Sequence, residues 1–135
     1  MATTGYSGKP LYQKLGVKDV HRVLLIDAPE PFTEWLQAPF SLNLTDGEEL
    51  LDYIHVFVKE QALLKEYLPQ LRKMMQQNGM IWVSWPKKAS KVQTNMSEDQ
   101  VRALAFPLDL VDVKVCSVSD VWSGLKLMIR KEKRR

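Results

Sequence analysis

Six side chains of types that bind ligands follow, or lie close to, the ends of predicted strands. They are Asp27, Lys87, Lys88, Asp120, Trp122 and Ser123. If the strand over 110–118 runs parallel to the central strands, its following turn meets Lys87 and Lys88 at one edge of the sheet. Two lysines, an acid, an indole and a hydroxyl at one edge predict a site for a small anionic ligand or a partner protein.

Two other interpretations stand beside that prediction. An atypical or degenerate transferase-like enzyme would use Lys87 together with Asp120. Alternatively, the lysines are simply solvated and Trp122 packs against the core, as large aromatic side chains commonly do. We favour a non-catalytic binding module over an enzyme, because no complete catalytic set accompanies these residues.

The turn after the first predicted strand argues against the common nucleotide cofactors. S-adenosylmethionine and nicotinamide folds need glycines there, so that the backbone can approach the cofactor. In this chain the turn spans Asp27 to Phe32 and contains two prolines and no glycine. A phosphate-binding Gly-x-x-x-x-Gly-Lys-Ser/Thr loop is absent from the sequence too. No cofactor is therefore predicted.

Histidine, cysteine and paired acids do not assemble into a second site. His55 falls inside a predicted buried strand, where we expect a hydrogen-bonded core residue, and His21 precedes the first strand. Cys116 lies in an apolar run, so we expect an inert core thiol. The cysteine and the two histidines are not closely spaced, so they do not predict a zinc site. The acid pairs Glu48–Glu49 and Glu98–Asp99 are typical of a loop and of a helix first turn.

The 135 residues fit one domain over 1–130 followed by a basic tail over 131–135. The formal net charge is +3, but without the last six residues 14 basic side chains face 15 acidic ones. The positive charge therefore belongs to the tail, which argues against a nucleic-acid partner. No apolar run is long enough to span a membrane and no signal peptide is visible, so we expect a cytoplasmic protein.

Two apolar runs predict buried parallel strands, and a helix joins the second of them to a third. The runs are 22–27 and 53–58, and the helix pattern covers 59–77 with Pro69 either kinking it or starting a second helix. We expect Asn78-Gly79 to cap that helix and 80–85 to form the central strand. A short helix over 10–15, ended by Gly16, and a helical turn over 33–37 pack around these strands.

The remaining pattern predicts strands at the margins of the sheet. Residues 39–44 alternate as an edge strand does, and 110–118 and 125–130 predict an antiparallel hairpin. Between them, Ser97 and Gln100 predict a capping box that starts a helix ending at Pro107. The fold class is α/β: a three-layer Rossmann-like, methyltransferase-like sandwich, mostly parallel, with a C-terminal antiparallel strand.

Several segments together resemble an uncharacterised bacterial family, domain of unknown function 3052. The segments are Tyr6-Ser-Gly-Lys-Pro-Leu, Lys14-Leu-Gly-Val-Lys, Gly79-Met-Ile-Trp-Val-Ser-Trp-Pro-Lys-Lys, Leu110-Val-Asp-Val-Lys-Val-Cys and Trp122-Ser-Gly-Leu-Lys. The resemblance covers nearly the whole chain and implies a small bacterial cytoplasmic protein without an established activity. It transfers no catalytic residue. Asp109 departs from the family pattern, which implies a glycine closing the preceding helix.

Overall fold

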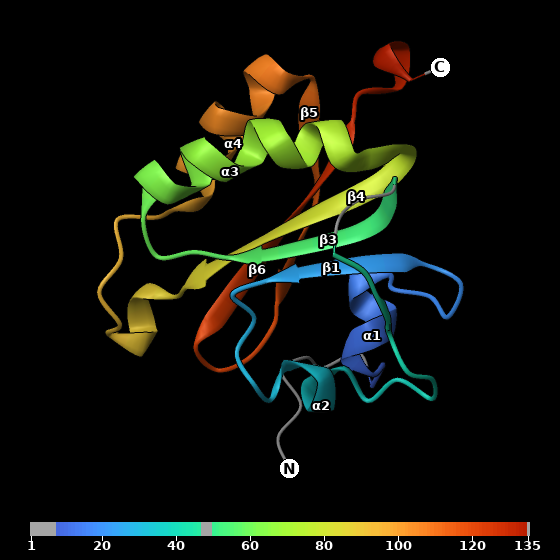
Figure 1. Cartoon of the computed structure of the whole chain (residues 1–135). Helices are drawn as coiled ribbons and strands as arrows, with labels where there is room; N and C mark the ends of the chain where they lie inside the picture. The colour runs from blue at the N-terminus through green and yellow to red at the C-terminus, as the bar shows by residue number, and fades with distance from the viewer. Residues whose placement is uncertain (1–7, 47–49, 135) are drawn as a thin grey trace.

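The computed structural model describes residues 8–46 and 50–134, and within these residues the chain forms one mixed sheet of six strands between two layers of helices. Helices α3 and α4 cover one face of the sheet, and α1 and α2 cover the other (Figure 1). This arrangement confirms the predicted three-layer α/β class. The acid pair Glu48–Glu49 lies outside the described residues.

The elements follow one another as the apolar runs predict. The helices are α1 (Leu11–Leu15), α2 (Phe32–Leu36), α3 (Gln61–Met74) and α4 (Glu98–Ala105), with 3-10 turns at Lys88–Ser90, Phe106–Leu108 and Lys131–Lys133. The strands are β1 (Arg22–Ile26), β2 (Asn43–Leu44), β3 (Leu51–Phe57), β4 (Met75–Pro86), β5 (Leu110–Ser117) and β6 (Trp122–Ile129). Gly16 ends α1 in the left-handed conformation, with φ of 82°, as predicted.

The strand order is β2-β1-β3-β4-β6-β5. The first four strands in this order pair in parallel, and β6 runs antiparallel to both β4 and β5. Strand β5 therefore runs in the direction of β4. For that reason the β5–β6 turn lies at the same edge as the carboxyl ends of β1, β3 and β4, which we call the carboxyl edge.

Strand β4 is the centre of the packing. Residues 79–86 are all buried, and the side chains of β4 contribute to the apolar clusters on both faces of the sheet. Trp82 is fully buried, and its indole N–H donates a hydrogen bond to the carbonyl of Leu15 at 2.8 Å. Trp85 is 6% exposed. Both tryptophans therefore belong to the core.

The predicted end of α3 is wrong. The helix stops at Met74, and Gly79 lies inside β4 rather than at a helix cap. A register shift in the β3–β4 ladder brings Gly79 close to the backbone of β3. A Cβ atom at Gly79 would lie 2.8 Å from the carbonyl oxygen of Leu51. The glycine is needed for this close approach, whereas a cap glycine would need a positive φ.

Two further local predictions differ from the structure. The edge strand is limited to Asn43–Leu44, so most of the alternating segment before it makes no ladder. Ser97 occupies the N-cap of α4, but its side chain makes no capping hydrogen bond. The Gln100 Oε1 atom is buried without a partner, so the capping box does not form. Pro69 lies within one continuous helix, which excludes the second-helix alternative.

The turn at Asp109 has the conformation that a glycine usually takes. Asp109 has φ of 63°, and its N–H donates to the carbonyl of Phe106 at 3.1 Å. Aspartate tolerates this left-handed region better than most residues. Its carboxylate also pairs with the Arg130 guanidinium at 2.7 Å, which ties the turn to the end of β6. The turn at Asp109 thus keeps the left-handed conformation without a glycine, and the ion pair with Arg130 is an additional contact.

The C-terminal residues continue from β6 into ordered contacts. Lys131–Lys133 form a 3-10 turn, and the Arg134 guanidinium donates to the carbonyl of Ile129 at 2.7 Å. Among the described residues, no helix has the length and apolar character needed to cross a bilayer.

Candidate functional site

The carboxyl edge is where an open α/β sheet binds its ligands, at the point where the strand order reverses. In this fold the chain moves outward from β1 to β2 and then returns to place β3 on the other side of β1. The reversal point therefore lies between β1 and β3. Asp27 follows the first of these strands and Lys59 follows the second. Lys87 and the β5–β6 turn lie farther along the same edge.

Lys87 is held against the β5–β6 turn by two hydrogen bonds. Its backbone N–H donates to the carbonyl of Val121 at 2.7 Å. Its ammonium donates to the Ser117 hydroxyl at 2.6 Å. The neighbouring residue Pro86 pairs with Trp122 in the β4–β6 ladder. The predicted meeting of Lys87 with this turn is therefore present in the fold.

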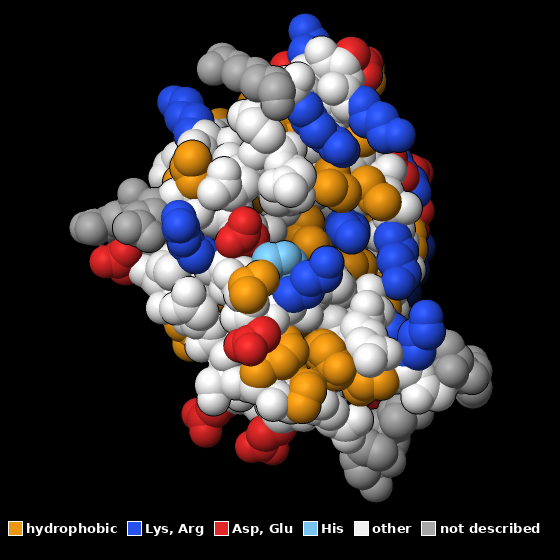
Figure 2. All heavy atoms as spheres, turned by 90° about the vertical axis from the view of Figure 1, so that its right-hand side faces the viewer, with side chains coloured by type: hydrophobic (Ala, Val, Ile, Leu, Met, Phe, Trp, Pro, Cys, Tyr) orange, Lys and Arg blue, Asp and Glu red, His pale blue; other side chains and the backbone are white. Residues whose placement is uncertain are grey.

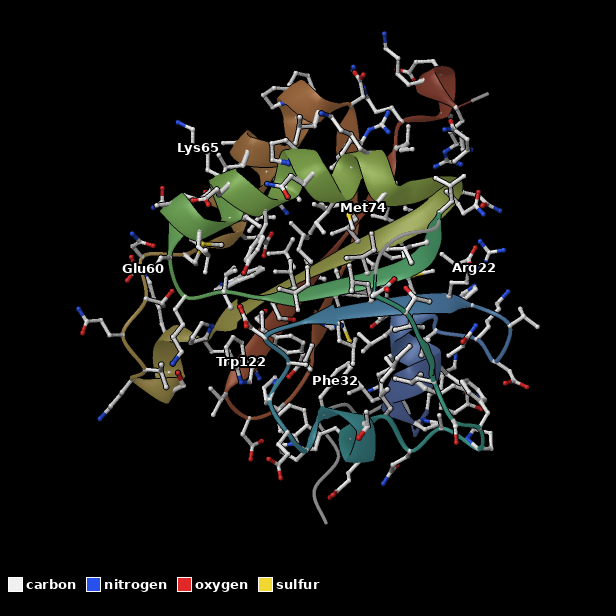
Figure 3. The ribbon with its side chains drawn as sticks, viewed as in Figure 1. Arg22, Phe32, Glu60, Lys65, Met74 and Trp122 are labelled. Carbon is white, nitrogen blue, oxygen red and sulfur yellow. The ribbon has the colours of Figure 1, made fainter. Side chains whose placement is uncertain are left out.

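Trp122 is half-buried at the start of β6. Together with Lys87 and the β5–β6 turn it makes up the surface that we call the Lys87 corner. The Trp122 ring meets the Phe57 ring edge to face, with centroids 5.2 Å apart. Phe57 in turn stacks on His55 with centroids 4.4 Å apart. Figure 3 shows Trp122 and Phe32 on the side of the sheet that carries α1 and α2. The indole thus closes the aromatic layer of the core and still reaches solvent.

The other predicted site residues occupy neighbouring positions on β6, the 3-10 turn and the β5–β6 turn. Ser123 stands next to Trp122 in β6, opposite Trp85 and Ser117. Lys88 begins an exposed 3-10 turn, and Asp120 lies exposed on the β5–β6 turn. Within the described residues, Asp120 makes no ion pair with Lys87, whose ammonium is directed at Ser117 instead.

Asp27 belongs to a different part of the carboxyl edge. Strand β3 separates its strand β1 from β4, so Asp27 faces the reversal point and not the Lys87 corner. It has φ of 55°, and the Tyr67 hydroxyl of α3 lies 3.5 Å from its carboxylate. The negative charge of Asp27 raises the pKa of Tyr67, with desolvation adding to the same effect. Asp27 thus forms a second, smaller polar group with α3.

The loop between β4 and α4 closes over the end of β3, which the sequence analysis did not anticipate. Asn95 accepts the N–H of Gln61 on its side-chain oxygen at 2.8 Å, and the Thr94 hydroxyl donates to the Lys59 carbonyl at 2.6 Å. Helix N-termini commonly bind anions through such free N–H groups. Here the first turn of α3 is already capped by Asn95. A ligand would therefore find less donor capacity at α3 than the fold ordinarily provides.

A buried polar network lies beneath the aromatic layer. His55 is fully buried, its Nδ1 atom is 2.8 Å from the Tyr53 hydroxyl, and its Nε2 atom is 2.7 Å from the Ser84 hydroxyl. Burial lowers the pKa of His55 to about 3, so the ring is neutral at physiological pH. The predicted hydrogen-bonded core histidine is confirmed. Ser84 is fully buried as well, so the network stabilises the core and does not face a substrate.

Cys116 and the metal-binding residue types add no chemistry at this edge. The thiol is buried, and desolvation raises its pKa, which disfavours the reactive thiolate. Across the described part of the chain, no group of three or more histidine, cysteine or acidic side chains is arranged to hold a metal ion.

The turn after β1 does not fit the usual glycine-rich cradle for a nucleotide cofactor. Pro29 and Pro31 occupy it, and Phe32 then enters the core, 5.0 Å from the His55 ring and 5.2 Å from the Phe57 ring between centroids. One feature of such folds is nevertheless present, because the acid Asp46 follows β2. An acid about 20 residues beyond the first turn binds the ribose in dinucleotide folds. The sequence signal, an acid after an edge strand, was present but not singled out.

Comparisons with known proteins identify the fold and no closer relationship. No protein-family model and no curated protein matches the chain. A solved S-adenosylmethionine-dependent methyltransferase from Clostridium acetobutylicum is similar, with a TM-score of 0.60, 8% identity, and coverage of 88% of this chain and 87% of that one. The ribosomal protein L11 methylase from Lactobacillus delbrueckii subsp. bulgaricus has a TM-score of 0.56 and 13% identity, covering 87% of this chain and 74% of that one.

A third solved structure gives the same result. A SAM-dependent methyltransferase from Aquifex aeolicus has a TM-score of 0.55 and 14% identity, with coverage of 87% of this chain and 86% of that one. At these identities the likeness establishes a Rossmann-like, methyltransferase-like fold. The chemistry has to be argued from the side chains at the carboxyl edge.

Proposed function

We propose that this protein is a non-catalytic binding module that takes a small anionic ligand at the carboxyl edge, in the corner between Lys87 and Trp122. One observation carries the proposal: two hydrogen bonds fix Lys87 against the β5–β6 turn, through Val121 at 2.7 Å and through Ser117 at 2.6 Å. An ammonium held in place loses less conformational freedom when it binds an anion. Cytoplasmic location and membership of the uncharacterised bacterial family stay predictions.

The side chains around Lys87 support a ligand with an anionic group and a flat apolar part. The ammonium has three donors, and one of them is directed at Ser117. Lys88 adds a second positive charge on the exposed 3-10 turn. Trp122, which follows Val121 in the chain and pairs with Pro86, presents a half-buried indole at the same edge of the sheet, and an indole suits an aromatic or aliphatic ligand surface.

The same corner gives little support to catalysis. Lys87 and Asp120 make no ion pair with each other in the described part of the chain, so the predicted enzyme pair is not assembled. His55, which could move protons at neutral pH if exposed, is fully buried with both ring nitrogens engaged. Catalysis would require Lys87 to leave Ser117 and pair with Asp120, or His55 to become exposed. Binding of an anion requires neither change.

The test is a ligand titration read at Trp122 itself. The indole N–H signal of Trp122, assigned with a Trp122→Phe variant, is followed by NMR while nucleotides, acyl phosphates and S-adenosylmethionine are added. We expect one ligand class to move this signal saturably and Lys87→Ala to abolish the effect. Lys65→Ala on α3 removes an equal charge far from the corner and serves as the control (Figure 3). A titration unchanged by Lys87→Ala would contradict the proposal.

A second candidate is binding of an adenosyl ligand at the reversal point between β1 and β3. Asp46 after β2 favours it, and so do the solved methyltransferases of similar fold. The glycine-free turn at Pro29 and Pro31 disfavours the usual binding mode. Calorimetry with S-adenosylhomocysteine decides between the candidates: this one predicts binding that Asp46→Asn weakens and Lys87→Ala does not. An absence of binding at millimolar ligand removes this candidate.

A further inference from the structure

Four lysines gather on the face of the sheet that carries α1, around the C-terminal end of that helix. They are Lys14, Lys18, Lys114 and Lys126, which we call the lysine cluster. Figure 2 shows Lys and Arg side chains concentrated beside a histidine on this side of the molecule. Because the body of the chain without its last six residues has 14 basic and 15 acidic side chains, the cluster is a local excess of positive charge.

Lys114 and Lys126 are directly opposite each other in the β5–β6 ladder. Like charges in this position repel and destabilise a sheet. Lys114 relieves part of its charge by donating from its ammonium to the carbonyl of Lys14 at 2.8 Å, near the negative end of α1. The carbonyl of Lys14 thus holds the Lys114 ammonium in place. The positive charge of Lys126, on the opposite strand, is not balanced by this contact.

The Lys126 side chain is half-buried, and among the described residues its ammonium makes no hydrogen bond or ion pair. Its ammonium lies 3.7 Å from the position that a Cβ atom would take at Gly16, so it is directed at the end of α1. Desolvation lowers the pKa of Lys126, and Lys114 and Lys18 lower it further. An ammonium in this situation gains stability from any anion that reaches it.

His21 supplies a further donor beside the cluster. Its Nδ1 atom accepts the N–H of Lys18 at 3.0 Å, so in the neutral ring the proton is on Nε2. Burial lowers the pKa of His21, Lys18 and Lys126 act in the same direction, and Asp52 opposes them. Asp52 is the acid facing this group, and its carboxylate already accepts the N–H of Arg22 at 2.8 Å.

We propose that the lysine cluster binds a small phosphate anion carrying several charges, such as a diphosphate. Lys114 and Lys126 both direct their ammonium groups at the end of α1, and two neighbouring positive charges match the charge and the multiple acceptor oxygens of such an anion. A nucleic-acid strand is the weaker alternative, because stacking platforms for bases require exposed aromatic rings. Tyr12, the aromatic residue of α1, is instead packed edge to face against Phe40, with centroids 5.5 Å apart.

The cluster is separate from the corner at Lys87, although β5 passes through both. Ser117, which contacts Lys87, lies three residues beyond Lys114 on this strand. Three residues of a strand span about 10 Å. Substitution of Lys87 therefore tests the proposed function, and substitution of Lys126 tests the lysine cluster, without overlap.

The experiment measures thermal stability during titration with pyrophosphate, at ionic strength held constant with sodium chloride. We expect a saturable rise of Tm in the wild-type protein, and Lys126→Met should weaken the apparent affinity about tenfold or more, the cost of one charge-assisted hydrogen bond. Lys65→Met and Lys87→Ala should retain the wild-type response. Without pyrophosphate, Lys126→Met should have a Tm equal to or above that of the wild type, because it removes the repulsion with Lys114.

Three results would overturn the proposal. One is the absence of a saturable Tm rise in the wild-type protein. Another is an equal loss of affinity in Lys126→Met and in Lys65→Met. The third is tight binding of a single-stranded oligonucleotide without any response to pyrophosphate, which would assign the surface to nucleic acid. If Lys126→Met does not fold, Lys18→Met, at an exposed position, provides the same comparison.

Discussion

The buried His55 should make the stability of this protein depend on pH in a defined window. Its pKa is lowered to about 3 in the folded state, against 6.5 for an unperturbed histidine. Between these values the unfolded chain binds a proton that the folded protein does not. The stability contributed by neutral His55 is therefore complete above about pH 6.5 and is lost progressively as the pH falls.

The size of the effect follows from the width of the window. Each pH unit below 6.5 costs about 1.4 kcal/mol of unfolding free energy. Lowering the pH from about 7.5 to about 5.0 should thus remove about 2 kcal/mol. Ordinary carboxylates titrate mainly below this range.

Urea unfolding at the two pH values measures this difference. Because the pKa of His21 is lowered as well, the parent protein for the experiment is His21→Gln. In that background, His55→Gln keeps a hydrogen-bond donor and acceptor but cannot gain a proton. The variant should start less stable and lose much less stability on acidification. A parent with equal stability at both pH values, or a His55→Gln variant with an unchanged pH dependence, would refute the argument.

Two further predictions concern backbone positions. Gly79→Ala should cost about 1–3 kcal/mol, the usual penalty for overpacking, because its Cβ would lie 2.8 Å from the Leu51 carbonyl oxygen. In urea unfolding, Gly79→Asn should be no more stable than Gly79→Ala. A Gly79→Asn variant with nearly the wild-type free energy of unfolding would indicate a left-handed helix cap instead. Asp109→Gly should lose little stability, since the ion pair with Arg130 is partly exposed and is screened by solvent. Asp109→Val should lose at least about 1–2 kcal/mol more in thermal unfolding, because φ is 63° there; equal losses would contradict this.

The sequence predicted the sheet because its strands are continuous apolar runs. Residues 80–85 and 53–58 read as doubly buried strands, and both proved central. The boundary between α3 and β4 was missed for a physical reason. Met74 and Met75 continue the helical apolar spacing and Gly79 is suited to a cap, yet pairing with β3 outweighs both signals. Local propensity is a weak prior wherever tertiary pairing is available.

The directions of the strands determine which residues of the candidate site meet at the carboxyl edge, and that part of the site could be predicted from the sequence. Lys87 meets the β5–β6 turn because β5 runs in the direction of β4. The hairpin pattern predicted that β5 and β6 are antiparallel to each other, and it left the direction of β5 relative to β4 as a condition. Asp27 could not be separated from that corner without knowing that β3 lies between β1 and β4. The opposition of Lys114 and Lys126 was equally hidden, because a register shift in the β5–β6 ladder sets the pairing.

The position of β6 has a consequence for how the molecule assembles. This strand is the last of the described chain, yet it lies between β4 and β5 in the interior of the sheet. During synthesis, β4 would present an unpaired apolar edge until residues 122–129 emerge from the ribosome. Such an edge is a template for association with other chains. The final strand therefore completes the sheet by covering the edges of both β4 and β5. A chain interrupted before residue 122 would leave the β4 edge unpaired and would be prone to aggregate, even though most of its core residues have been made.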